Sequence, residues 1–144
     1  FRDAPISSLP SWTSITGLQI ENLVLNNHRI IKAMLRVPPE EIEMEGPFFQ
    51  RKTERHPGCQ IDSLIQTKFN TLYVIEIKFS RNIIGTSIIE EMKEKMMRLK
   101  TPKQFFCRPI LIHINGVSDE LIDSNYFHHI IDMAEFFSRT EDAF

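Results

Sequence analysis

The chain has 144 residues, of which 42% are hydrophobic and 25% charged, and a formal net charge of -2 at pH 7. This composition indicates one globular domain with enough apolar material for a core. No apolar run approaches the ~20 residues that a membrane-spanning helix needs, and no basic-then-apolar signal segment opens the chain, so we expect a cytoplasmic protein. The two cysteines lack metal-ligand spacing and are expected to be reduced thiols.

The first residues differ in composition from the rest. Residues 1–11 contain Pro5, Pro10 and several serines, which favours a linker or docking arm. Residues 12–144 are predicted to form a single domain, because we find no internal repeat and no low-complexity stretch within them.

A long amphipathic helix is predicted to begin this domain. Thr16 and Gln19 form a capping box, and apolar residues recur at helical spacing until the chain reaches Pro38. Glu21 lies near the apolar stripe, where its position fits a first-turn glutamate that complements the helix dipole. His28 lies on the same flank and is interpreted as an ordinary packed or solvent-facing histidine.

An acidic loop and a strand are predicted next. Glu40–Glu45 is interpreted as a solvated loop, and residues 47–53 as a first strand with alternating faces. Residues 54–57 turn this strand toward the next one.

The stretches 58–66 and 72–78 are the centre of the sequence. Each is short, rich in β-branched or aromatic residues and bounded by turn-like residues, so together they predict a β-hairpin. Asp62, Glu76 and Lys78 interrupt otherwise apolar runs, where an ionised group costs several kcal/mol unless it is paired or bound to a metal. Glu76 and Lys78 are two residues apart and therefore share a face of their strand.

The register of the hairpin decides whether Asp62 joins that face. Pairing Asp62 with Glu76 also pairs Gln66 with Leu72, and leaves either a five-residue loop or a three-residue loop in which Asn70 takes a positive φ. In that register two carboxylates converge with an ammonium group. Carboxylate oxygens are ligands suited to Mg²⁺ or Mn²⁺.

The second half of the chain supplies a helix that flanks the hairpin. A helix is predicted over residues 87–99, with a capping box formed by Ser87 and Glu90. Lys95 falls within its buried stripe. The commoner outcome for such a lysine is that its stem covers apolar surface and its ammonium pairs with Glu91.

Two strands and a closing helix complete the predicted fold. Residues 109–115 are apolar on both faces, as in a central strand covered on two sides, and His113 within them is interpreted as a core histidine. Residues 127–131 form a short last strand, and Asp132 begins a closing helix. The resulting order is α-β-β-β-α-β, an α/β (α+β) fold with a mixed sheet between helices.

These residues carry a family resemblance. Asp62, a gap of thirteen residues and then Glu76-Ile77-Lys78 resemble the PD-(D/E)XK nuclease signature, with Ile61 where the family name has proline. The longer patterns Gly58-x-Gln60-Ile61-Asp62 and Val74-Ile75-Glu76-Ile77-Lys78, with the segment that begins at Trp12, resemble the nuclease-like C-terminal domain of prokaryotic AAA+ ATPases. The resemblance runs from about Trp12 to Phe137.

The resemblance implies a restriction-endonuclease-like fold and Mg²⁺- or Mn²⁺-dependent hydrolysis of DNA. It implies that the catalytic residues are Asp62, Glu76 and Lys78, and that the metal ligands are Asp62, Glu76, the carbonyl of Ile77 and Glu21. It also implies that Lys95 faces a phosphate. It further implies an AAA+ ATPase in the same parent chain, and none of the five glycines here belongs to a phosphate-binding loop, so we expect that ATPase outside this sequence.

The charges are unevenly distributed along the chain. Residues 1–47 carry four basic and six acidic groups, residues 48–108 carry twelve and six, and residues 109–144 carry one and seven. The middle part, which contains the motif, is therefore basic, as a partner of a phosphodiester backbone would be. A solvated basic surface would give the same pattern.

Two other interpretations stay open at this point. The domain could be a catalytically silent module that binds nucleic acid or a protein and regulates the ATPase. Alternatively, Asp62, Glu76 and Lys78 could form a purely structural ion-pair network.

Overall fold

A mixed sheet is the centre of the molecule. The computed structural model describes residues 28–132 except 56, 79 and 102. Its five strands lie in the order β1-β2-β3-β4-β5. Strands β1, β2 and β3 are antiparallel, whereas β3, β4 and β5 are parallel. The strands are β1 (Ile42–Gln50), β2 (Cys59–Thr67), β3 (Thr71–Lys78), β4 (Phe106–His113) and β5 (His129–Asp132).

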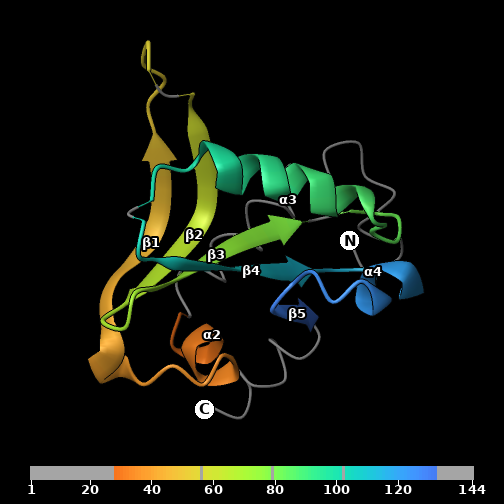
Figure 1. The fold of residues 1–144 in the computed structure, drawn as a ribbon. Helices are drawn as coiled ribbons and strands as arrows, with labels where there is room; N and C mark the ends of the chain where they lie inside the picture. The colour runs from red at the N-terminus through yellow and green to blue at the C-terminus, as the bar shows by residue number, and fades with distance from the viewer. Residues whose placement is uncertain (1–27, 56, 79, 102, 133–144) are drawn as a thin grey trace, which may run out of the picture.

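Helices cover the two faces of this sheet (Figure 1). α2 (His28–Met34) lies on one face and α3 (Ser87–Arg98) on the other, where α3 provides the crossover between the parallel strands β3 and β4. A 3₁₀ turn, η2 (Pro39–Glu41), leads from α2 to β1, and the short α4 (Asp119–Asp123) precedes β5. The expected order of helix, strand, hairpin, helix and strand is confirmed.

The core is divided by the sheet into two apolar clusters. The cluster on the α2 face is built on Ile30, Ile31, Leu35, Val37, Ile65, Ile75, Ile110, Ile112 and Ile131. The cluster on the α3 face includes Ile61, Leu64, Leu72, Val74, Ile84, Ile88, Met92, Leu99, Leu111 and Leu121. Residues 110–112 of β4 are fully buried because the strand is covered on both sides, as its unbroken apolar sequence predicts.

The central hairpin has the expected register. Gln66 pairs with Leu72, and the pairing continues through Ile65 with Tyr73 to Ser63 with Ile75. Of the two possible loops, the tighter one forms, because β2 ends at Thr67, β3 begins at Thr71 and Asn70 has a φ of 59°. The Thr67 hydroxyl holds this loop by accepting a hydrogen bond from the Thr71 N–H at 3.2 Å.

A β-bulge interrupts β2 at the position of the motif. Between the pairs Gly46–Leu64 and Phe48–Ile61, one residue of β1, Pro47, faces Asp62 and Ser63 of β2. Proline has no N–H to donate to the ladder, which favours an interruption at this point. Ile61 and Leu64, although three residues apart, consequently both belong to the cluster on the α3 face.

The first strand begins earlier than predicted. The stretch Glu40–Glu45 was expected to be a solvated loop, but residues 42–45 are the first half of β1. A register shift between Ile42 and Met44 interrupts the alternation there, so Ile42 packs against the cluster on the α2 face whereas Met44 is 48% exposed on this edge strand. The acidic side chains find partners on neighbouring elements, with Glu45 3.1 Å from the Lys32 ammonium of α2.

Other elements differ at their ends. α3 has Thr86 as its N-cap, without a side-chain hydrogen bond, so the predicted capping box of Ser87 and Glu90 is wrong. β4 begins at Phe106, because pairing with β3 extends it beyond the apolar run. α4 was missed, although Ser118 caps it by accepting a hydrogen bond from the Leu121 N–H at 3.1 Å.

Several expectations concern residues outside the described part of the chain. They are the N-terminal linker of residues 1–11, the predicted helix before His28 with Glu21, and the closing helix after Asp132. Within the described part of the chain, no helix has the length and apolar character needed to cross a membrane.

A buried histidine joins α2 to the hairpin. The His28 Nε2 atom lies 3.0 Å from the Ser63 Oγ atom, and its Nδ1 atom lies 3.6 Å from a carboxylate oxygen of Glu45. Burial lowers the pKa of His28 below its ordinary value of 6.5, and Glu45 opposes this only in part. The interpretation of His28 as a packed residue is confirmed.

The pH dependence of stability should report this contact. Because the folded state holds His28 neutral, the unfolded state binds more protons near pH 6, and the free energy of unfolding should fall as the pH decreases below 6.5. In His28→Gln this part of the decrease should be absent. Urea unfolding at pH 7.5 and 5.5 measures it, with His129→Gln as a control; an unchanged pH slope in His28→Gln would contradict the assignment.

Candidate functional site

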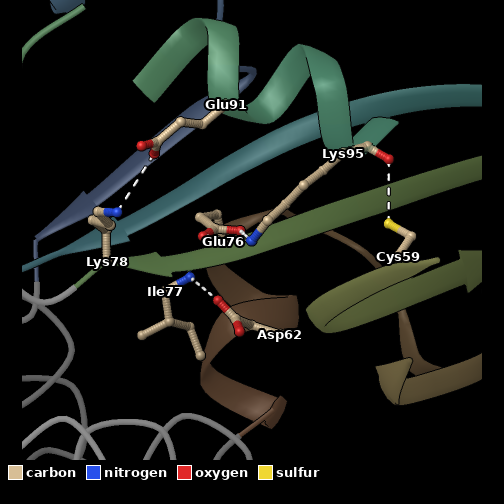
Figure 2. A network of polar contacts seen from close by, with 7 residues as sticks. All are labelled: Cys59, Asp62, Glu76, Ile77, Lys78, Glu91 and Lys95. Carbon is tan, nitrogen blue, oxygen red and sulfur yellow. Dashed lines mark hydrogen bonds and ion pairs between the residues drawn. The ribbon is translucent and has the colours of Figure 1, made fainter. Parts of the chain in front are cut away.

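The motif residues meet at the end of β3 beneath α3 (Figure 2). Asp62 comes from the bulge of β2, and Glu76 and Lys78 come from the last residues of β3. Glu91 and Lys95 reach the same place from α3. The parallel crossover through α3 therefore brings charged groups from three elements together.

Glu76 is the most buried charged group of this site. Its exposed fraction is 8%, and both of its carboxylate oxygens accept hydrogen bonds from the Lys95 ammonium, at 2.9 and 2.8 Å. Burial raises the pKa of Glu76, and the hydrogen bond from Lys95 opposes this shift. Burial also acts to lower the pKa of Lys95, but the hydrogen bond and charge of Glu76 outweigh it and raise the pKa above its ordinary value. The two groups thus depend on each other, Glu76 more so because it is farther from water.

Asp62 is held by the main chain of the neighbouring strand. One oxygen of its carboxylate accepts a hydrogen bond from the Ile77 N–H at 2.8 Å. The regular pairing of β2 with β3 ends at Ser63 and Ile75, so this side chain bonds a main-chain donor just beyond the ladder. The charge of Asp62 also contributes to the raised pKa of Glu76, which indicates that the two carboxylates are close.

The direction of Asp62 does not follow from simple alternation. The bulge shifts the alternation between Ile61 and Leu64, so pairing opposite Glu76 does not by itself put Asp62 on the face of Glu76. The carboxylate of Asp62 lies against the β3 main chain, whereas that of Glu76 lies against α3 (Figure 2).

The ion pairs of the two lysines differ from the one predicted for Lys95. Lys95 was expected to pair with Glu91, but it pairs with Glu76 because it lies on the side of α3 that faces β3. Glu91 instead faces Lys78, with 3.5 Å between the ammonium nitrogen and the nearest carboxylate oxygen. Lys78 and Glu91 are 40% and 55% exposed, so their pair is screened by water and adds little to stability.

Two open clefts adjoin these groups. One, of about 390 Å³, is lined by Glu76, Lys78, Glu91, Glu94, Lys95 and Arg98. The other, of about 380 Å³, is lined by Gly58, Cys59, Gln60, Asp62, Lys95 and Arg98. Lys95 and Arg98 line both clefts, so two cationic side chains of α3 stand beside both carboxylates.

The residues present offer a partial fit to a divalent metal. Asp62 and Glu76 provide hard oxygen donors on adjacent strands, and the burial of Glu76 makes a compensating cation favourable. Among residues 28–132, apart from those not described, no three His, Cys, Asp or Glu side chains gather as a metal site. A third ligand would therefore come from another kind of oxygen donor, such as a main-chain carbonyl, or from outside the described residues, where Glu21 lies.

Sequence reasoning missed three residues that shape the site. Arg98 lines both clefts, and Cys59 ties β2 to α3 by donating its S–H to the Lys95 carbonyl at 3.3 Å. Gln50 bonds the last turn of α3 across 48 residues of sequence. Arg98 could have been found from its spacing three residues after Lys95, but nothing local in the sequence indicates the contacts of Gln50 or Cys59.

Comparison with known proteins supports the fold. No protein-family model and no curated protein matches the chain. The structure is similar to a repair endonuclease from Pyrococcus abyssi, with a TM-score of 0.50 and 20% identity over 78% of this chain and 44% of that chain. It is also similar to a protein of unknown function, with a TM-score of 0.51 and 16% identity over 76% of this chain and 56% of that chain.

The chain thus spans about half the length of each of these two proteins. At these identities the likeness concerns the fold. The mixed five-stranded sheet with flanking helices is a restriction-endonuclease-like fold, as expected from the sequence.

Removing the Lys95 ammonium should expose the cost of burying Glu76. Lys95→Met leaves a buried carboxylate without its partner, which should lower the free energy of unfolding by about 1–3 kcal/mol at pH 7. Because burial raises the pKa of Glu76 above its ordinary value, this loss should shrink as the pH falls through that raised pKa and the buried carboxyl takes up a proton. Urea unfolding at pH 7 and pH 5 measures both effects.

A double variant and a neighbouring lysine provide the controls. Lys95→Met with Glu76→Gln should recover much of the loss, since no buried charge is then left unpaired. Lys93→Met, on the exposed side of α3 where Lys93 pairs with Glu90 at 3.8 Å, should change stability by less than about 0.5 kcal/mol. Equal losses in Lys93→Met and Lys95→Met would contradict this account.

Proposed function

We propose that this domain is a divalent-metal-dependent nuclease of the PD-(D/E)XK type that hydrolyses phosphodiester bonds of DNA. The observation that carries the proposal is the buried Glu76 carboxylate close to Asp62, with the cations Lys78 and Lys95 at the same end of β3. Carboxylates beside cations suit a reaction in which negative charge develops on a phosphate. The similarity of the fold to a repair endonuclease supports the same class of reaction.

The two carboxylates would hold the metal. Asp62 has one oxygen fixed by the Ile77 N–H, which orients its carboxylate, and the Ile77 carbonyl and Glu21 are further proposed ligands. When bound, Mg²⁺ or Mn²⁺ supplies a water of lowered pKa and neutralises charge on the phosphate. Glu76 would exchange the Lys95 ammonium for the metal, since either cation compensates its buried charge.

The two lysines would act on the phosphate and the attacking water. Lys78 is 40% exposed and lines the larger cleft with Glu76, so its ammonium can orient the water or stabilise charge on the phosphorus oxygens. Lys95, once released from Glu76, would face a phosphate from the opposite wall formed by α3. Arg98 lines both clefts and would add a further positive charge.

We also propose that this domain belongs to a longer chain with an AAA+ ATPase. The resemblance of residues 12–137 to such domains is the support for this proposal. The ATPase would then control when the nuclease meets its substrate.

The second candidate is a nuclease-fold module that binds nucleic acid or a protein without cutting. Two observations favour it: Lys95 already satisfies both oxygens of Glu76, and the described residues contain no three-residue metal cluster. In that case the ion pair would be a structural replacement for the metal.

Cleavage assays decide between these candidates. With Mg²⁺ or Mn²⁺ the purified protein should cut DNA, and EDTA should abolish the activity. Asp62→Asn and Glu76→Gln should abolish it as well, because each removes a carboxylate charge that would bind the metal. Lys78→Ala should lower the turnover rate by a factor on the order of 10² while Mn²⁺ binding, measured by calorimetry, is kept.

Glu90→Gln is the matched control, since Glu90 lies on α3, is 80% exposed and lines neither cleft. It should keep full activity, and circular dichroism should show all variants folded. A protein that binds but never cuts single- or double-stranded DNA with either metal, alone or with its ATPase, supports the silent module instead.

A further inference from the structure

The connection between β1 and β2 projects from the fold beside the end of α3 (Figure 1). We call residues 51–55 of this connection the arm. All five of its residues are exposed, and three of them are basic: Arg51, Lys52 and Arg55. Its only acidic residue is Glu54, so the arm carries a net positive charge on a chain whose total is -2.

The cations of the arm are not used by the described fold. No ion pair or side-chain hydrogen bond joins Arg51, Lys52 or Arg55 to another of the described residues. Most other basic groups of the site are paired, for example Arg98 with Glu94 at an i, i+4 position. Three cations on one projection, none of them paired within the described part of the chain, form a surface suited to a polyanion.

An exposed aromatic ring lies just before the arm, near the end of β1. Phe49 is 72% exposed, on the open edge of the sheet, whereas its neighbour Phe48 packs into the cluster on the α3 face. A ring this exposed buries little of its surface within the described fold, and it offers a face on which a base can stack. A base is available for such stacking in a single strand, because the bases of a duplex are already stacked on each other.

Gln50 fixes the point where the arm leaves β1 to the end of α3. Its side-chain amide nitrogen donates to the carbonyls of Pro57, at 2.8 Å, and Arg98, at 2.7 Å. Its amide oxygen accepts from the Lys100 N–H at 2.8 Å. The arm is thereby tied at its root to the last turn of α3, whose Arg98 lines both clefts.

We propose that the arm and Phe49 bind single-stranded nucleic acid, with one base stacked on Phe49 and the phosphates on Arg51, Lys52 and Arg55. Phe48 and Gln50 face α3, so Phe49 between them points to the other side of the edge strand β1. The proposal rests on the proposed function in that the bound strand passes around this edge and over the end of α3 toward the cleft of Glu76. Gln50 keeps the arm in place relative to this cleft.

Fluorescence anisotropy with a labelled single strand of thymidines and a duplex of equal length tests the stacking. Phe49→Ala should weaken binding of the single strand on the order of tenfold, as the loss of one stacked base does, and leave binding of the duplex nearly unchanged. Phe69→Ala is the matched control, because Phe69 is 69% exposed in the loop at the other end of β2. Equal effects of the two substitutions overturn the stacking.

Salt titrations of the same complex test the phosphate contacts. Arg51, Lys52 and Arg55 all replaced by Gln should reduce the slope of log K against log salt by about 2, because each phosphate contact to a single strand contributes about 0.7. The control replaces three exposed cations outside the arm by Gln: Arg29 in α2, Arg36 just after α2, and Lys68 in the loop between β2 and β3. It should leave the slope nearly unchanged. A slope that falls equally in both variants shows general attraction only and overturns the proposal.

The failure of this proposal is distinguishable from that of the nuclease. If the wild-type protein cuts DNA but the arm variants bind and cut as well as it does, the arm has no such role and the nuclease stands. If the arm variants lose binding while the wild-type protein binds without cutting, the arm is supported and the nuclease fails. If the wild-type protein does not bind single-stranded DNA even at low salt, the proposed role of the arm is overturned.

Discussion

The charges of the candidate site are arranged around one buried carboxylate, that of Glu76. Glu76 is on a strand whose neighbouring residues fill both apolar clusters, so its charge needs a cation at close range. In the described structure α3 supplies that cation through Lys95. The apolar cluster packs α3 over the sheet, and within that arrangement this contact places Lys95 between Glu76 and the two clefts.

The contact between Glu76 and Lys95 is compatible with both functional interpretations, a metal site and a structural ion pair. A buried carboxylate with a displaceable cation can serve as a metal ligand, and with a permanent cation it is a structural ion pair. The affinity of a divalent metal for this place must exceed that of a tethered ammonium group, and a nearby second carboxylate, Asp62, raises it. Under the proposed function, the balance between these cations would determine whether the site holds a metal or an ion pair.

Much of the fold could be predicted from the sequence, and less of the site. The hairpin register follows from the position of Asn70 and the apolar alternation, and α3 from its periodic apolar residues. The partner of Lys95 and the turn of Asp62 toward Ile77 could not be predicted, because they depend on how α3 crosses the sheet and on a bulge opposite Pro47. Local patterns specify which groups are charged and buried, but the contacts between distant elements choose their partners.

The sequence distances of these contacts imply an order of assembly. Asp62 and Ile77 are 15 residues apart within one hairpin, so their bond can form as soon as β2 and β3 pair. Gln50 and Lys100 are 50 residues apart, and their bond requires β1 and the end of α3 to be in place together. The hairpin can thus form with Asp62 oriented while the carboxylate of Glu76 is still in water. Docking of the crossover helix α3 is then the step that buries this carboxylate and gives it the Lys95 ammonium as a partner.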